Sequence, residues 1–168
     1  MATSSTSSRT APAFGFAFSH PAHFVALGFG AGLARHAPGT FGTLLAFPLW
    51  WLIGPAYSPP IQAAIVALLF AIGIWACEVT GRDLGVADHG AMCWDETVAF
   101  LLVLVIAPAG WRWQLTALLI FRAFDIVKPP PIRALEARFK GGFGVMLDDL
   151  LAAGYTLLAL AFAKRLFA

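Results

Sequence analysis

A long stretch without charge limits what this chain can fold into more than any other feature. No Asp, Glu, Lys or Arg occurs between Arg35 and Glu78. A turn-like segment at 54–60, Gly-Pro-Ala-Tyr-Ser-Pro-Pro, divides this stretch in two. We therefore predict two hydrophobic helices, at 42–53 and 61–77. The second is near the minimum of roughly 17 residues that a helix needs to cross a membrane.

The later apolar runs follow the same pattern. Runs at 97–107 and 113–124 are separated by a Pro-Ala-Gly turn, and a last helix is expected at 148–162. Because no run shows the strict alternation of a strand, we expect an all-α fold. The predicted architecture is a compact polytopic helical membrane bundle with about four to five hydrophobic helices. Residues 1–20 are expected to form a disordered tail, and 21–168 a single domain.

The composition also indicates a membrane environment. Hydrophobic residues make up 60% of the chain and charged residues 12%, whereas soluble domains have roughly 45–50% and about 25%. The net charge of +2 is too small, and its basic residues are too scattered, for a nucleic-acid-binding surface. Cys77 and Cys93 lack the spacing of a zinc site or a disulfide framework, so we interpret them as packing residues.

The basic residues predict an orientation in the membrane. With about five crossings and the amino end inside, most basic residues fall on one face, which matches the preference of cytoplasmic loops for positive charge. The polar segments at 78–96 and 122–149 then lie together in the cytoplasm. The predicted cytoplasmic residues are Arg9, Arg35, Arg82, Arg122, Lys128, Arg133, Arg138 and Lys140, and those on the opposite face are Arg112, Lys164 and Arg165.

Every acidic residue of the chain lies between positions 78 and 149. Two adjacent pairs, Asp95-Glu96 and Asp148-Asp149, directly precede apolar runs and are expected to open helices. Capping and the helix dipole offer a purely structural interpretation. Adjacent like charges repel each other, however, and a bound cation accounts for two such pairs. Because carboxylate oxygens are hard ligands, the pattern favours Mg²⁺, which typically takes one or two protein carboxylates and completes its shell with water and phosphate.

The segment at 121–133 adds charges of the opposite sign. Arg122, Asp125 and Lys128 are spaced three apart, so a helix would place them on one face, and the prolines at 129–131 would end that helix. A salt-bridged stripe is the structural alternative. Charges within an apolar membrane helix are more often functional. The cationic side chains of Arg122 and Lys128, beside a carboxylate cluster, would suit a phosphate group held through a metal ion.

Glycine-rich segments at 28–32, 38–43 and 141–144 precede predicted helices. Their backbone amides would be able to cradle an anion. The alternative is that the glycines allow helices to pack closely. No Lys follows the last glycine as in a nucleotide P-loop. Thr40 and Thr43 would either donate to a phosphate or cap the first helix.

These segments resemble the phosphatidylglycerophosphatase A family, bacterial membrane enzymes that remove the terminal phosphate from phosphatidylglycerophosphate. The resemblance extends from about residue 24 to 155, with its motifs in the family's order. The matching segments are GFGAGL at 28–33, PGTFGTL at 38–44, WDE at 94–96, FRAFDIVKP at 121–129, PIR at 131–133 and GGFGVMLDD at 141–149.

The resemblance implies a magnesium-dependent phosphomonoesterase that acts on a lipid headgroup at the cytoplasmic surface of the bacterial inner membrane. The expected catalytic residues are Asp95, Glu96, Asp125, Asp148 and Asp149, with Asp95, Glu96, Asp148 and Asp149 as metal ligands. The expected phosphate-binding residues are Arg122, Lys128, Arg133, Thr40 and Thr43. Asp125 would orient a cation or act as nucleophile. Attack by a metal-activated water and attack by a carboxylate both remain open.

Two other classes of function are possible. A small transporter or channel subunit would use the carboxylates as an ion path, but it needs polar residues at mid-membrane depth, and here they stand at the ends of apolar runs. A scaffold for a lipid-synthesis complex would release no phosphate. Other phosphatase designs lack their motifs, since no histidine has an Asp four residues later and neither Asp-x-Asp-x-Thr nor Asp-Gly-x-x-Ala-Arg occurs.

Overall fold

The computed structural model describes residues 12–167, apart from the side chains of 136, 137 and 167. This part of the chain consists of helices and loops and contains no strand, which confirms the all-α prediction. The helices are α1 (Phe14–Ala17), α2 (Pro21–Ala26), the 3₁₀ helix η1 (Gly28–Leu33), α3 (Pro38–Ile53), α4 (Pro59–Leu84), α5 (Trp94–Ile106), α6 (Trp111–Val127), α7 (Ile132–Arg138) and α8 (Gly141–Phe167).

The observed helices start earlier than the sequence predicted. The tail predicted at 1–20 includes α1, while residues 1–11 lie outside the described part of the chain. Pro38 and Pro59 each stand in the first turn of a long helix, where a proline's missing N–H costs no hydrogen bond. Pro59 fell in the predicted turn at 54–60, and Pro38 in the glycine-rich segment expected to precede the first helix, so both predicted helices began too late.

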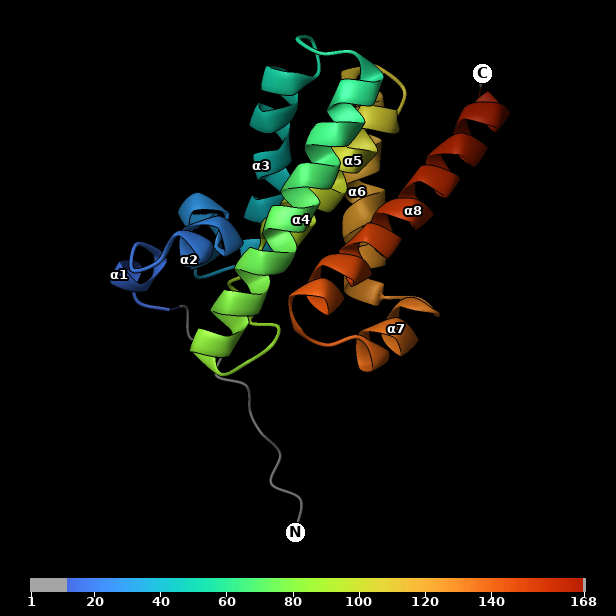
Figure 1. Cartoon of the computed structure of the whole chain (residues 1–168). Coiled ribbons are helices and arrows are strands. Elements are labelled where there is room, and N and C mark those ends of the chain that lie inside the picture. The colour runs from blue at the N-terminus through green and yellow to red at the C-terminus, as the bar shows by residue number, and fades with distance from the viewer. Residues whose placement is uncertain (1–11, 168) are drawn as a thin grey trace.

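Five long helices form an antiparallel bundle, in which α8 packs against α4, α5 and α6, and α5 packs against α3. Because α3, α4, α5, α6 and α8 alternate in direction, the starts of α3, α5 and α8 lie at the same end of the bundle as the ends of α4 and α6 (Figure 1, lower part). We call this end, marked by Pro38, Leu84, Trp94, Val127 and Gly141, the site end.

The centre of the bundle is built around α5. Phe100 of α5 is fully buried, with its ring centroid 5.6 Å from that of Phe47 in α3 and 5.4 Å from that of Phe121 in α6. A small residue brings α8 and α4 together at the site end. A side chain on Gly142 would place its Cβ 2.0 Å from the backbone oxygen of Ile74. Close approach through small residues is the usual way in which membrane helices pack.

Among the described helices, α4 and α8 are long and apolar enough to cross a membrane, fewer than the four to five predicted. Only 28% and 44% of their most apolar windows are buried inside the protein, whereas the core helix of a soluble protein is mostly buried. The shorter helices explain the difference. With 16 and 13 residues, α3 and α5 reach only about 24 and 20 Å at about 1.5 Å per residue, short of a hydrocarbon layer of about 30 Å.

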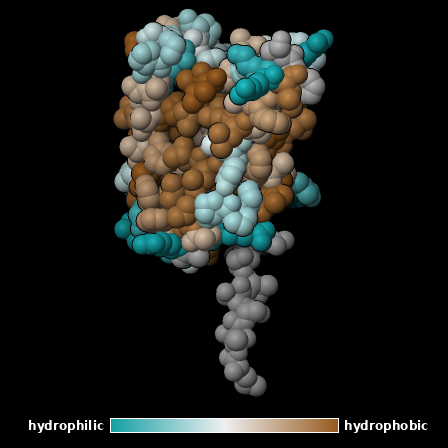
Figure 2. All heavy atoms as spheres, turned by 90° about the vertical axis from the view of Figure 1, so that its right-hand side faces the viewer, coloured by the Kyte–Doolittle hydropathy of each residue, from teal (hydrophilic) through white to brown (hydrophobic). Residues whose placement is uncertain are grey.

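The outer surface carries an apolar band. Figure 2 shows this band in brown between hydrophilic rims in teal at the two ends of the molecule. Its exposed side chains include Leu119 on α6 and Leu158 and Phe162 on α8, each at least 65% exposed. Large contiguous apolar surfaces are rare on soluble monomers. Together with α4 and α8, the band is typical of a membrane protein.

Candidate active site

The two acidic pairs occupy different positions in their helices. Asp95 and Glu96 stand in the first turn of α5, as predicted. Asp148 and Asp149 do not open a helix, because α8 already begins at Gly141 and places them about two turns inside. The glycines of 141–144 were expected to precede this helix. Instead they lie within α8, where the close packing of Gly142 against α4 confirms the alternative interpretation of this segment.

Carboxylates from three helices converge near the site end. Oxygens of Glu96 on α5, Asp125 on α6 and Asp149 on α8 all lie within 4.8 Å of one another. We call these three residues the carboxylate cluster. It contains two of the four predicted metal ligands and adds Asp125, which the sequence placed beside a cation or as a nucleophile.

The carboxylate cluster has the chemistry of a divalent-cation site. Glu96 Oε2 and Asp149 Oδ2 are buried and have no hydrogen-bond partner, and the same holds for Oδ1 of neighbouring Asp95. Buried polar atoms in folded proteins are nearly always paired, so unpaired carboxylate oxygens call for a proton or a cation. Three converging carboxylates supply the hard oxygen ligands that such a cation prefers.

Arg122 joins three helices at the edge of the cluster. Its Nη1 donates to Glu96 Oε1 at 3.2 Å and to Asp125 Oδ2 at 2.5 Å. The same nitrogen lies 3.4 Å from Thr43 Oγ1, whose hydroxyl donates to the carbonyl of Gly39 at 2.9 Å. Of the predicted phosphate-binding residues, Arg122 therefore lies directly against the cluster, and Thr43 lies beside Arg122.

Lys128 reaches the site from outside the helix that was expected to carry it. The predicted stripe had Lys128 on one helical face with Arg122 and Asp125, but α6 ends at Val127 and Lys128 adopts left-handed backbone angles. The following proline explains this ending, since it disfavours the helical conformation at the residue before it. From there Lys128 Nζ donates to Asp148 Oδ2 at 2.5 Å.

The remaining predicted phosphate-binding residues lie farther out. Arg133 is exposed, and its Nη2 donates to the carbonyl of Val127 at 2.9 Å, which caps the last turn of α6. Thr40 is half-buried in the first turn of α3. Neither residue belongs to the carboxylate cluster.

Two glycines of α3 allow α5 to approach. A Cβ on Gly39 would lie 1.9 Å from Glu96 Oε1, and one on Gly42 would lie 2.5 Å from the backbone oxygen of Cys93. Any larger residue would therefore push the start of α5, and Glu96 with it, away from α3. For 38–43 the close-packing interpretation is confirmed.

Burial controls the ionisation of the first turn of α5. It raises the pKa of Glu96 to about 8, even though the Arg122 guanidinium beside it acts in the opposite direction. Burial, and next the charge of Glu96, raise the pKa of Asp95 well above its ordinary value. A bound divalent cation would offset this effect, because it favours the ionised carboxylate.

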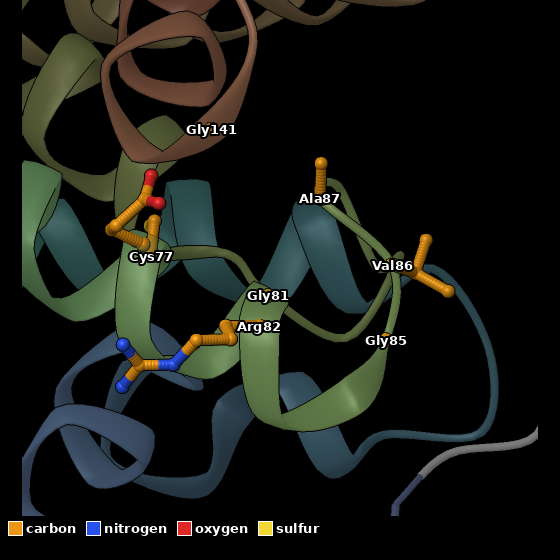
Figure 3. A pocket seen from close by; sticks show the side chains of 8 residues that line it. Cys77, Gly81, Arg82, Gly85, Val86, Ala87 and Gly141 are labelled. Atoms are coloured by element: carbon orange, nitrogen blue, oxygen red, sulfur yellow. The ribbon is translucent and has the colours of Figure 1, made fainter.

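Two adjoining cavities open at the site end. The larger, of about 260 Å³, lies between the end of α4, the loop that follows it and the start of α8 (Figure 3). It is lined by Cys77, Glu78, Gly81, Arg82, Gly85, Val86, Ala87 and Gly141. No member of the carboxylate cluster lines it. A smaller cavity of about 70 Å³ shares Ala87 and Gly141 with it and reaches Asp148, one residue from the cluster.

Sequence reasoning missed one structural role at the site end. The backbone N–H of Gly142 donates to Glu78 Oε2 at 2.6 Å, so Glu78 caps the start of α8 from α4. The two residues are 64 positions apart. No local pattern could have indicated their contact.

Fold and site together define a helical membrane protein with an acid-rich, cation-flanked site. The family model for phosphatidylglycerophosphatase A matches residues 24–164. The chain belongs to this family.

Named relatives agree with the family match. The chain is 42% identical to phosphatidylglycerophosphatase A of Haemophilus influenzae over 140 residues, which covers 83% of this chain and 86% of the relative. It is 40% identical to phosphatidylglycerophosphatase A of Escherichia coli, over 80% of this chain and 78% of the relative. A Bacteroides thetaiotaomicron protein, provisionally named a phosphatidylinositol-3-phosphatase, is 38% identical, over 83% of this chain and 91% of the relative. No solved structure matches the chain.

Proposed function

We propose that this protein hydrolyses the terminal phosphomonoester of phosphatidylglycerophosphate, with Mg²⁺, to give phosphatidylglycerol and inorganic phosphate. The observation that carries the proposal is the carboxylate cluster of Glu96, Asp125 and Asp149 in a member of this family. The names of the Haemophilus and Escherichia relatives support the substrate. The reaction belongs to phospholipid biosynthesis.

The carboxylate cluster is the proposed metal site. Its three side chains come from different helices, so the folded bundle is needed to assemble them. Asp95 and Asp148, their neighbours in sequence, complete the acidic environment. When bound, the metal ion would neutralise phosphate charge and lower the pKa of a coordinated water.

The basic residues supply the complementary charge. Arg122 is held by Glu96 and Asp125, which fixes its guanidinium beside the cluster. Lys128 is held by Asp148 on the neighbouring side. Phosphomonoester hydrolysis requires accelerations of up to about 10²¹-fold, so fixed charges around the transferring phosphoryl group are essential. In this proposal Arg122 and Lys128 bind the equatorial phosphate oxygens.

The proposed location is the bacterial inner membrane, with the site end facing the cytoplasm. Arg35, Arg82, Arg133, Arg138 and Lys140 lie near the starts or ends of helices at the site end. At the opposite end, Arg112 stands in the first turn of α6, and Lys164 and Arg165 in the last turn of α8. The excess at the site end supports a cytoplasmic orientation. Arg9, also predicted on this side, lies outside the described residues.

The deciding experiment measures phosphate release from phosphatidylglycerophosphate by the purified protein in detergent micelles. We expect release that requires added Mg²⁺ and stops with a chelator. Asp149→Asn should lower it about 10³-fold, whereas the control Asp83→Asn, a similar change outside the cluster, should retain it. Phosphatidylinositol 3-phosphate, suggested by the Bacteroides relative, serves as the rival substrate. Absence of release by the wild type would refute the phosphatase, and a fully active Asp149→Asn variant would refute the metal site.

A further inference from the structure

The segment that precedes α3 is free of charge and rich in phenylalanine. No Asp, Glu, Lys or Arg occurs between Arg9 and Arg35. The structure describes this segment from residue 12 onward, as α1, α2 and η1. Its phenylalanines are Phe14, Phe16, Phe18, Phe24 and Phe29. A surface segment of this composition is unusual on a protein surrounded by water, where charged residues cover exposed helices.

Four of these phenylalanines form a continuous strip. The ring centroids of Phe14 and Phe18 are 5.0 Å apart, those of Phe18 and Phe24 are 5.4 Å apart, and those of Phe24 and Phe29 are 5.2 Å apart. Phe14 is 73% exposed, Phe18 59% and Phe29 44%. We call Phe14, Phe18, Phe24 and Phe29 the phenylalanine strip.

The opposite face of the segment is fixed to the bundle. Ala22 and Ala26 of α2 are fully buried, and α2 packs against α4. The carbonyl of Ala26 accepts a hydrogen bond from the backbone N–H of Cys93, at 2.9 Å. His23 is also buried, and its Nε2 lies 3.0 Å from Asp83 Oδ2 on α4. The strip is therefore the outward face of a firmly attached element, which Figure 1 shows beside the lower parts of α3 and α4.

The segment is too short to cross a membrane. α1 has four residues, and α2 and η1 have six each, so none is longer than about 12 Å. Helices this short leave most of their backbone N–H and C=O groups without hydrogen bonds inside the helix. The segment therefore does not lie in the hydrocarbon interior, where no water can satisfy these groups. The headgroup layer offers water to those groups and apolar contact to the phenylalanines.

A tryptophan on α4, the adjacent candidate membrane span, indicates that this segment lies at the depth of the membrane interface. Trp75 of α4 is 46% exposed, and its ring centroid is 6.1 Å from that of His20, at the start of α2. Exposed tryptophans on membrane helices concentrate at the interface between headgroups and hydrocarbon. The phenylalanine strip thus continues a surface that already faces lipid.

We propose that α1, α2 and η1 form an interfacial element that lies in the headgroup layer of the protein's own membrane, with the phenylalanine strip inserted into the lipid. Phe29 connects the strip to the site end. Its ring meets that of Trp94 edge to face at 5.3 Å, and Trp94 immediately precedes Asp95. The element therefore sets the depth at which the acidic site meets lipid headgroups. The proposal depends on membrane embedding and does not require phosphatase activity.

Spin labels measure this depth directly. The protein carrying Phe18→Cys is labelled and reconstituted in vesicles of phosphatidylethanolamine and phosphatidylglycerol, with Arg35→Cys as the control at the edge of the segment. The native Cys77 and Cys93 are fully buried, and wild-type protein treated with the same spin label gives their background. The Phe18 label should collide several-fold more with oxygen, relative to a water-soluble nickel complex, than the Arg35 label. Equal ratios would overturn the proposal.

A second copy of the chain is the rival occupant of the strip. It would appear as spin–spin broadening between Phe18 labels that disappears when labelled protein is diluted with unlabelled protein. That result would also overturn the proposal.

A functional measurement separates this proposal from the proposed reaction. Phe14→Ser combined with Phe18→Ser should raise the KM for long-chain phosphatidylglycerophosphate in vesicles about five-fold or more, and leave hydrolysis of a soluble short-chain analogue unchanged. Equal loss on both substrates would contradict an interfacial role. If the wild type hydrolyses neither substrate, the proposed reaction fails, while the label depths still decide the membrane contact.

Discussion

The acidic pairs Asp95-Glu96 and Asp148-Asp149 look alike in sequence but sit differently in the fold. The first pair opens α5, and the second lies about two turns inside α8. One member of each, Glu96 and Asp149, enters the carboxylate cluster. Of the others, Asp148 pairs with Lys128 and Asp95 is buried beside the cluster. Neighbouring residues on a helix point about 100° apart. One carboxylate of each pair therefore points into the cluster, and the other points in a different direction.

The largest effects should separate the two members of a pair. Glu96→Gln and Asp149→Asn each remove a cluster carboxylate, and we expect each to lower kcat about 10³-fold. Asp95→Asn lies outside the cluster and should cost about 10-fold. Asp83→Asn should remain within about two-fold of the wild type. Initial rates of phosphate release at saturating Mg²⁺ measure all four variants. Equal losses in the Asp95 and Glu96 variants would break the distinction.

The pair of Asp148 and Lys128 should couple in stability. Lys128→Met and Asp148→Asn each remove one side of the ion pair between Lys128 and the buried Asp148 carboxylate. Because Lys128 is partly exposed, we expect a coupling energy of about 1–3 kcal/mol. Thermal unfolding of both single variants and the double variant in detergent gives this energy.

A double variant whose destabilisation equals the sum of the single ones would contradict a structural ion pair. We also expect kcat to fall about 10- to 100-fold in Lys128→Met, since Lys128 is proposed to bind phosphate.

The sequence revealed the helical class because the apolar runs have no strand periodicity, and it located the acidic residues. It could not show that Asp125 joins Glu96 and Asp149, because this meeting depends on how α5, α6 and α8 pack. It placed the start of α8 too late, at 148, because the glycines of 141–144 were expected to precede the helix. In the bundle, Glu78 caps that helix and Gly142 packs against α4, and both contacts are supplied by a distant segment.

Stability without metal should depend on pH through the first turn of α5. The pKa of Glu96 is raised from 4.5 to about 8 in the folded protein. Between these values the folded state holds a proton that the unfolded state has released, so unfolding releases a proton. Stability is therefore highest at the acidic end of this window and falls as the pH rises toward 8.

The measurement is the thermal midpoint of the metal-free protein, in detergent with a chelator, across this pH range. Added Mg²⁺ should restore the midpoint most strongly near pH 8, because the ionised carboxylates are its ligands. In Glu96→Gln the decline should be smaller. A midpoint that rises with pH in the metal-free wild type would contradict a raised pKa at Glu96.

The smallest effects should come from the threonines of α3. Thr43→Val removes a buried hydroxyl that donates to Gly39 and lies beside Arg122. We expect a loss of about 1 kcal/mol in stability and about five-fold in kcat. Thr40→Val, its matched control in the first turn, should lower stability by less than Thr43→Val does and change kcat by less than two-fold. Thermal unfolding and phosphate release compare the two. A larger effect of Thr40→Val would indicate that the outer threonine contacts phosphate.

Binding of Mn²⁺ tests the central claim most directly, because it reports on the carboxylate cluster without requiring activity. Mn²⁺ replaces Mg²⁺ at oxygen sites and its free form is quantified by electron paramagnetic resonance. Asp125 is the cluster member that the packing of the helices adds to the ligands predicted from sequence. We predict that Asp125→Asn weakens Mn²⁺ binding at least 10-fold while Asp83→Asn binds as the wild type does. Unchanged affinity in Asp125→Asn would contradict a metal site formed by Glu96, Asp125 and Asp149.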